Sequence, residues 1–254
     1  MPNLLNLSKT ESENLLNLRK DNLMLCLEKN NLLGTKARVA LVLDYSGSMR
    51  SLYRNGSVQA VIERLLPIAM QFDDNGEMEL WLFDDSYRRM PNISLNNYYG
   101  YVENEILSRG YHMGCTSYAP VMNDVAKKYM VEEPMPIADY VIFITDGENS
   151  DKANARATVV KTSEYPIFWQ FVGIGRESFS FLRSLDEMTG RYVDNANFFT
   201  INDMLNASDN EIYQKLLAEF PAWLNDPKVK DLIATKYNGL NGIKPRGFFS
   251  RFLN

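Results

Sequence analysis

The chain of 254 residues carries a formal net charge of −5 and has a sequence pI of about 5.1. Its content of 45% apolar and 23% charged residues is typical of a globular protein with a buried core, and its negative charge gives no electrostatic basis for binding nucleic acid across the surface. The longest apolar runs have the length of strands and fall far short of the roughly 20 residues that a membrane span needs.

Cysteine and histidine are scarce. Cys26 and Cys115 are the only cysteines and His112 is the only histidine. A disulfide framework is therefore excluded, and a histidine-based zinc site or a Ser-His-Asp triad centred away from His112 is nearly excluded. The first residues, MPNLLNLSKTESE, lack the positive start and the apolar stretch of a signal peptide. We therefore expect a cytoplasmic protein.

The N-terminal segment 3–33 has an ambiguous pattern. Leucines alternate between positions 23 and 27 as they would in a strand. Asp21 and Gly34, however, bracket the stretch like the N-cap and the C′ residue of a helix. The pattern therefore favours a helix over residues 21–32.

From residue 38 onward, apolar β-branched runs alternate with stretches of helical spacing. Pro67 is expected to bend or end the first part of the helix in which it lies. The predicted strands are 37–44, 77–85, 138–148 and 166–175, and the predicted helices are 57–72, 117–131, 152–163, 179–188 and 211–224.

This alternation predicts an α/β fold with a doubly wound, mostly parallel central sheet and helices on both faces. The simplest division has one domain at 36–225, preceded by an N-terminal extension at 1–35. A C-terminal extension at 226–254 follows, and it ends in a basic and aromatic tail.

Acidic residues follow two of the predicted strands, at Asp44 and Asp146. Ser46 and Ser48 alternate with other residues after Asp44, and Thr116 precedes a predicted helix. The carboxyl ends of parallel strands meet at one edge of a sheet, so these five side chains are expected to converge. Carboxylates and hydroxyls are hard oxygen donors, which suit Mg²⁺, with Ca²⁺ or Mn²⁺ as alternatives. The serines and the threonine would bind the cation directly, and the acids would act through water.

The motifs DYSGS, GCTSYAP and ITDGE resemble the metal-ion-dependent adhesion site (MIDAS) of von Willebrand factor type A (vWA) domains. That site combines Asp-x-Ser-x-Ser with a distant Thr and a distant Asp-Gly, which correspond to Asp44, Ser46, Ser48, Thr116 and Asp146. Further phrases, such as KARVALVLDYSGSM and WQFVGIG, are similar to intracellular bacterial vWA proteins of tellurium-resistance clusters, which are related to copine vWA domains. The resemblance implies a doubly wound fold, a bound divalent cation and protein binding without catalysis, in a tellurium-resistance or stress-response setting.

Helix capping offers a plainer interpretation of the same residues. Asp44, Ser46 and Ser48 could form an N-cap after a turn, and Thr116 could cap the helix that follows it. Capping does not explain why Asp146 and Thr116 are also expected at the edge of the sheet where Asp44 lies, so the metal site is preferred.

Other acidic residues near strand ends are expected to form hydrogen bonds within their own turns and helices. Asp84 and Asp85 are expected to cap a surface turn, and Glu148 and Asp151 to cap the helix that follows them, with an acidic rim as the alternative. The stretch GIGRES at 173–178 lacks the third glycine of a dinucleotide-binding loop, so a nucleotide role is not expected.

Three functions remain open. The leading one is a binding module whose cation accepts an acidic side chain of a partner protein. The alternative is a Mg²⁺-dependent phosphohydrolase with Asp44 as nucleophile, but that chemistry usually uses a second acid where this chain has Ser46. The third is a scaffold whose metal site is structural.

The C-terminal tail, KPRGFFSRFLN at 244–254, mixes basic residues with phenylalanines. As a helix it would present an apolar stripe that could enter a partner groove or bind weakly to an anionic membrane. A frayed end, or phenylalanines folded back on the domain, is slightly preferred.

Overall fold

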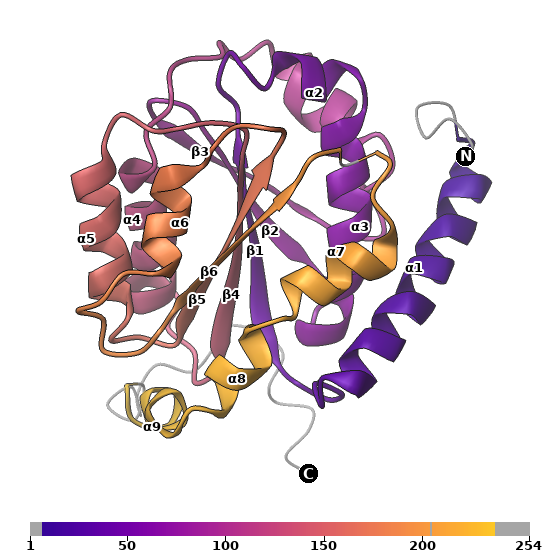
Figure 1. The fold of residues 1–254 in the computed structure, drawn as a ribbon. Coiled ribbons are helices and arrows are strands. Elements are labelled where there is room, and N and C mark those ends of the chain that lie inside the picture. Colours follow the sequence, from indigo (N-terminus) through magenta and orange to yellow (C-terminus); the bar gives the residue numbers. More distant parts are fainter. Residues whose placement is uncertain (1–6, 204, 237–254) are drawn as a thin grey trace.

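A six-stranded sheet forms the centre of the molecule (Figure 1). The computed structural model describes residues 7–203 and 205–236. The strands lie in the order β3-β2-β1-β4-β5-β6, with β3 antiparallel to β2 and every other neighbouring pair parallel. Their bounds are β1 (Ala37–Asp44), β2 (Met78–Phe83), β3 (Tyr87–Ile93), β4 (Ala138–Thr145), β5 (Ile167–Ile174) and β6 (Ala196–Ile201).

Helices cover both faces of the sheet (Figure 1). In β1, Val39 and Leu41 pack into one hydrophobic core, while Ala40 and Val42 pack into the other. The first core includes residues of α3 and α7, and the second includes residues of α4, α5 and α6. The α-helices are α1 (Lys9–Lys29), α2 (Arg50–Arg54), α3 (Ser57–Phe72), α4 (Ala119–Lys127), α5 (Lys152–Thr162), α6 (Ser180–Asp186), α7 (Asp209–Leu216), α8 (Phe220–Asn225) and α9 (Pro227–Thr235).

The predicted doubly wound α/β fold is confirmed. β1 and β4 are neighbours in the sheet, yet the chain proceeds from β1 to β2 and β3 on one side and from β4 to β5 and β6 on the other. This change of direction is a topological switch point, beside which open α/β sheets bind their ligands. The carboxyl ends of β1 and β4, where Asp44 and Asp146 stand, lie at this point.

Two strands were not predicted, β3 and β6. Only Met90 and Ile93 are buried in β3, so this strand has no continuous apolar run, and Pro91 suits its position at the edge of the sheet. β6 is a six-residue strand at the opposite edge. Edge strands pack on fewer neighbours, and their sequences therefore carry a weaker apolar signal.

The prediction of a helix over residues 21–32 was wrong at its start, because α1 begins at Lys9. Ser8 caps this helix and exchanges hydrogen bonds with Glu11 in a capping box. Buried Arg19 then ties α1 to the body of the domain, with ion pairs to Glu63 of α3 at 3.2 Å and to Asp209 of α7 at 3.5 Å.

Several predicted helices differ from the observed ones in their bounds. α3 continues through Pro67 to Phe72, so the proline does not end it. The predicted helix 117–131 consists of α4 and a π-helical turn, Lys128–Glu132, and 211–224 divides into α7 and α8. The tail at 244–254 lies outside the described residues. In the described part of the chain, no helix is both long enough and apolar enough to cross a membrane.

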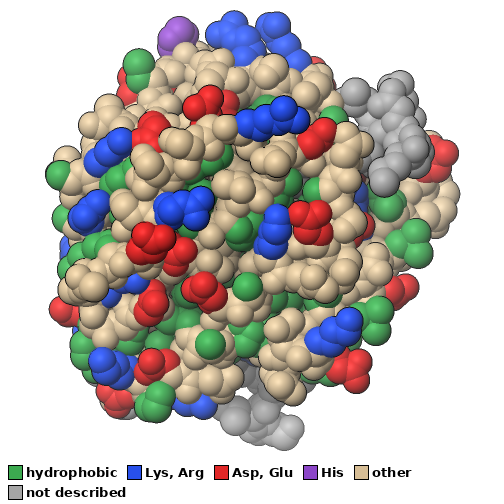
Figure 2. All heavy atoms as spheres, viewed as in Figure 1, with side chains coloured by type: hydrophobic (Ala, Val, Ile, Leu, Met, Phe, Trp, Pro, Cys, Tyr) green, Lys and Arg blue, Asp and Glu red, His purple; other side chains and the backbone are tan. Residues whose placement is uncertain are grey.

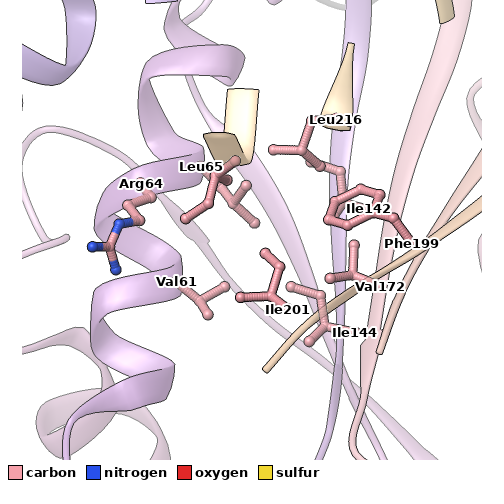
Figure 3. A pocket seen from close by; sticks show the side chains of 10 residues that line it. Val61, Arg64, Leu65, Ile142, Ile144, Val172, Phe199, Ile201 and Leu216 are labelled. Atoms are coloured by element: carbon pink, nitrogen blue, oxygen red, sulfur yellow. The ribbon is translucent and has the colours of Figure 1, made fainter. Parts of the chain in front are cut away.

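A small cavity of about 10 Å³ lies between α3 and the sheet (Figure 3). Apolar side chains line it, among them Val61, Ile142 and Val172. Figure 3 shows the guanidinium of Arg64 pointing away from it. A cavity of this size holds at most about one water molecule, so it is a packing defect of the core and not a ligand site.

Candidate metal centre

The candidate site is built by loops at the carboxyl edge of the sheet, near α2 (Figure 1). The backbone N–H of Gly47, in the loop after β1, donates a hydrogen bond of 3.1 Å to the carbonyl of Gly114. The loop that contains Gly114 is also held by the N–H of Ser117, which donates a hydrogen bond of 2.8 Å to the carbonyl of Asp84. The loops that follow β1 and β2 are thereby attached to the segment that carries Thr116.

Asp44 is a fully buried carboxylate at the end of β1. Its Oδ1 accepts a hydrogen bond of 2.7 Å from the N–H of Ser46, and its Oδ2 accepts one of 2.6 Å from the hydroxyl of Thr145. Burial nevertheless raises the pKa of Asp44 to about 6, because these hydrogen bonds replace only part of its lost hydration. A cation beside Asp44 would offset this cost of burying its charge.

Ser46, Ser48 and Asp146 form a connected chain of oxygen atoms. The hydroxyls of the two serines lie 3.0 Å apart, and the hydroxyl of Ser48 donates a hydrogen bond of 2.7 Å to Oδ1 of Asp146. Burial raises the pKa of Asp146, and the charge of Glu177 adds to the shift. Four of the five predicted site residues are therefore in one hydrogen-bonded cluster, since the N–H of Ser46 also binds Asp44.

Thr116 is held beside this cluster by its backbone. Its carbonyl accepts hydrogen bonds from the N–H and the hydroxyl of Ser150, at 3.0 and 3.1 Å. Within residues 7–203 and 205–236, its hydroxyl makes no hydrogen bond to the other four predicted ligands. The structure thus brings four of the five side chains into contact and leaves the hydroxyl of Thr116 apart from them.

The N-terminus of α4 is capped by Asp151, and not by Thr116 as its position before the helix suggested. The carboxylate of Asp151 accepts hydrogen bonds from the N–H groups of Tyr118 and Ala119, at 2.9 and 2.7 Å. Asp151 is also the N-cap residue of α5, as predicted, but its side chain makes no capping hydrogen bond to that helix. Asp151 instead joins the loop after β4 to the helix that follows Thr116.

Glu148 also accepts hydrogen bonds from a helix other than the one that follows it in the chain. Its carboxylate accepts hydrogen bonds from the hydroxyl of Ser180 and the N–H of Phe181, at 3.2 and 3.3 Å, in the first turn of α6. Lys152 pairs with it as well. Both acids of this loop therefore bind neighbouring elements and position the loop that carries Asp146.

Two tyrosine hydroxyls donate hydrogen bonds to backbone carbonyls of the site, and the sequence did not predict either of them. The hydroxyl of Tyr53 donates to the carbonyl of Asp44 at 2.9 Å. The hydroxyl of Tyr118 donates to the carbonyl of Gly147 at 2.6 Å and lies 3.3 Å from the hydroxyl of Thr145. Both residues are buried, and their hydrogen bonds reach backbone carbonyls of other segments, so nothing in the local sequence indicates this role.

The predicted role of Asp84 as a turn cap agrees with its contacts. Its Oδ1 accepts a hydrogen bond of 2.8 Å from the N–H of Ser86, and Arg88 pairs with it at 3.4 Å. Gly114 packs closely on this turn, because a Cβ there would lie 3.3 Å from Asp84 and 2.9 Å from the carboxylate of Asp85. The close approach explains why glycine suits position 114 in the loop that carries Thr116.

The donor set of the cluster fits a hard divalent cation. No group of three or more His, Cys, Asp or Glu side chains suited to a metal ion occurs in the described residues. A cation bound here would therefore use hydroxyl oxygens together with the two carboxylates. Such a donor set is suited to Mg²⁺, which binds through few carboxylates and keeps several waters.

Comparison with known proteins agrees with this architecture. The model of the family vWA-TerF-like, described as the vWA domain found in the TerF C terminus, matches residues 36–233. A protein of Bacillus subtilis (strain 168), named uncharacterized protein YcbR, is 43% identical over 241 residues, which cover 94% of this chain and 98% of that protein.

Two solved structures share the fold. Proximal thread matrix protein 1 from the mussel byssus, with a zinc-occupied MIDAS motif, matches with a TM-score of 0.54 and 15% identity over 72% of this chain and 47% of that one, so the chain spans about half the length of the mussel protein. An aerotolerance-related membrane protein from Bacteroides fragilis matches with a TM-score of 0.51 and 18% identity over 72% of this chain and 98% of that one. At these identities the similarity concerns the fold alone. The family match and the relative from Bacillus subtilis show that the chain belongs to the vWA-TerF-like family.

Proposed function

We propose that this protein is a binding module that holds a partner protein through a divalent cation at a MIDAS-type site. Asp44, Ser46, Ser48, Thr116 and Asp146 are the proposed cation-binding residues. The observation that carries the proposal is the hydrogen-bonded chain of oxygens from Ser46 through Ser48 to Asp146, beside the buried carboxylate of Asp44. The proposed cation is Mg²⁺, with Ca²⁺ or Mn²⁺ as alternatives.

Each group has a role in this proposal. The hydroxyls of Ser46, Ser48 and Thr116 would bind the cation, and Asp44 and Asp146 would supply the negative charge behind them. The bound cation would act as an electrophile that accepts a carboxylate from the partner. The zinc-occupied MIDAS motif of the mussel protein supports the idea that this fold accommodates a cation at such a motif.

Binding is proposed in preference to phosphohydrolysis because the loop after β1 carries no second acid two residues after Asp44. A phosphohydrolase with Asp44 as nucleophile would use a second acid two residues later, where this chain has Ser46. A serine hydroxyl cannot replace a carboxylic acid in that role at neutral pH. Mg²⁺-dependent hydrolysis of a generic phosphomonoester, abolished in Asp44→Asn, would favour the enzyme instead.

The proposed setting is cytoplasmic and connected with tellurium resistance or stress response. It follows from the resemblance to bacterial vWA proteins of tellurium-resistance clusters and from the vWA-TerF-like family match. Growth of a gene-deletion strain on tellurite tests this part of the proposal separately from the metal site.

The experiment that tests the central proposal is affinity capture of partners from the native host in Mg²⁺ and in EDTA. We expect a partner that the wild-type protein retains only with Mg²⁺ and that Asp146→Asn does not retain. The matched control is Asp231→Asn, which makes the same chemical change to an exposed acid of α9. A partner retained equally in EDTA, or by Asp146→Asn, would contradict the proposal.

A further inference from the structure

Two hollows open beside the candidate metal centre, and Arg50 and Arg54 of α2 line both of them. The first has a volume of about 500 Å³ and includes Ser48, one of the proposed cation-binding residues. The second has a volume of about 330 Å³ and extends towards Tyr111. A ligand that reaches the cation past Ser48 would therefore meet the two arginines next.

The two arginine side chains have no partner among the described residues. Both side chains are exposed, and neither makes a hydrogen bond or an ion pair with any residue in 7–203 or 205–236. Arg88, in contrast, pairs with Asp84 at 3.4 Å. Positions four apart on a helix lie on the same side, so both guanidinium groups can bind one anion.

The charges around the hollows favour an anionic ligand. Neither hollow has an aspartate or a glutamate in its lining, although the whole chain has a net charge of −5. Figure 2 shows acidic and basic side chains interspersed over the face of the molecule, with basic side chains gathered at the top, the end at which Figure 1 places α2. This local positive charge lies directly beside the site that would take a carboxylate.

The second hollow also has an apolar wall. Leu107, Tyr111 and Met113 contribute to it, and all three are half-buried. Such a wall suits an apolar side chain next to the charged groups and does not suit a free inorganic anion. The hollows together therefore match a peptide that carries both acidic and apolar residues.

We propose that the partner presents an acidic peptide segment, with one carboxylate on the cation, a second carboxylate between Arg50 and Arg54, and an apolar side chain in the second hollow. This inference rests on the proposed function, because the first carboxylate needs the cation. Ser48 and both arginines line the first hollow, and an extended peptide rises about 3.3 Å per residue. The two carboxylates of the segment are therefore expected one to three residues apart.

The test measures the binding of two labelled peptides by fluorescence anisotropy in Mg²⁺ and in EDTA. One has the sequence Gly-Phe-Asp-Gly-Glu-Gly, and the other carries Gln in place of Glu. The wild-type protein is expected to bind the peptide with two acids about tenfold more tightly, a factor that corresponds to about 1.4 kcal/mol. The difference should shrink at high salt, because the arginines are exposed.

Two double variants distinguish the effect of the arginines in the hollows from the effect of the protein's overall charge. Arg50→Gln/Arg54→Gln is expected to bind both peptides equally and to keep the effect of Mg²⁺. Arg156→Gln/Arg183→Gln, which removes two exposed arginines that line neither hollow, should keep the tenfold preference. Both variants should melt at the wild-type temperature, since the replaced side chains are exposed.

Each outcome assigns the result to one of the two proposals. If the wild-type protein shows no preference between the peptides, or if Arg50→Gln/Arg54→Gln keeps it, the inference about the arginines is overturned while the metal site stands. If Mg²⁺ has no effect on either peptide, the proposed function fails instead. Failure to bind either peptide overturns both proposals. Displacement of the peptide by inorganic phosphate at a lower concentration than by free glutamate would assign the arginines to phosphate and overturn the peptide assignment.

Discussion

The hydroxyl of Ser48 donates a hydrogen bond of 2.7 Å to the carboxylate of Asp146, although the two residues are 98 positions apart in the sequence. The contact joins the loop after β1 to the loop after β4 at the switch point of the sheet. It holds a hydroxyl and a carboxylate at the distance of a hydrogen bond, so a cation on the hydroxyl of Ser48 would have the negative charge of Asp146 beside it.

Magnesium is expected to raise the melting temperature of the wild-type protein. A ligand at 100 times its Kd stabilises the folded state by about 2.7 kcal/mol, and about 1 kcal/mol corresponds to roughly 2–4 °C for a domain of this size. Asp146→Asn should lose most of this shift, because it removes a charged cation-binding group. Differential scanning fluorimetry measures the shift, and an equal response of Asp146→Asn would contradict the assignment.

Replacing Asp151 with alanine should weaken both the fold and the binding of Mg²⁺. The change leaves the N–H groups of Tyr118 and Ala119 without their acceptor, which costs about 1–2 kcal/mol at a helix N-terminus. It also releases the segment that carries Thr116. Urea unfolding and calorimetric titration with MgCl₂ measure the two effects.

The matched control for this variant is Ser208→Ala. Ser208 caps α7 through a hydrogen bond of 3.2 Å from the N–H of Glu211, away from the metal centre. We expect a similar loss of stability and an unchanged affinity for Mg²⁺. If both variants lowered the affinity equally, the effect would come from general destabilisation and not from the loop.

The stability of the protein is expected to depend on pH through Asp73. Burial raises the pKa of Asp73 to about 7 from its ordinary value of 3.8, and Asp74 adds to the shift. The folded state therefore retains this proton where the unfolded chain loses it, and the stabilising contribution disappears as the pH rises from about 4 to about 7. Asp73→Asn should be more stable than the wild type at about pH 8 and should not be more stable at about pH 4. Thermal melts at the two pH values measure the difference, and Asp231→Asn, at an exposed position, is the control. Equal changes of melting temperature in the two variants at both pH values would refute the prediction.

Arg19→Met is expected to destabilise the fold by about 3–5 kcal/mol, because it leaves a buried carboxylate without its partner. Arg19 is 1% exposed and pairs with Glu63 and Asp209. Removing Glu63 as well, in Arg19→Met/Glu63→Met, should recover part of the loss. Chemical denaturation measures both values, and Lys29→Met on the exposed face of α1 serves as control. A small effect of Arg19→Met would show that α1 contributes little to the body of the domain.

Much of the architecture follows from local patterns in the chain. Mostly apolar runs predicted β1, β2, β4 and β5, because strands covered on both faces bury side chains at successive positions and so favour apolar residues there. The alternation of strands and helices then predicted the parallel sheet. β3 and β6 escaped prediction because edge strands have less apolar surface to bury.

The candidate cation-binding residues were also readable from the chain, since the acids and hydroxyls occur at the ends of predicted elements. Their spacing could place Asp44 and Asp146 on one edge of a sheet, but it could not describe how they are supported. The hydrogen bond from Thr145 to Asp44, the hydroxyl of Tyr118 on Gly147 and the capping of α4 by Asp151 all join separate elements.

Contacts of this kind depend on how distant segments are packed together, and no local periodicity encodes them. Asp151 precedes α5 in sequence and looks like its cap, yet the packing of α4 beside α5 places the free N–H groups of α4 within its reach. That Arg50 and Arg54 lack a carboxylate partner within the described residues is likewise a property of the folded surface, because it depends on which carboxylates the fold brings near them. Local residue patterns thus specify the elements and the types of ligand, whereas three-dimensional packing selects which polar groups meet and which remain available to a partner.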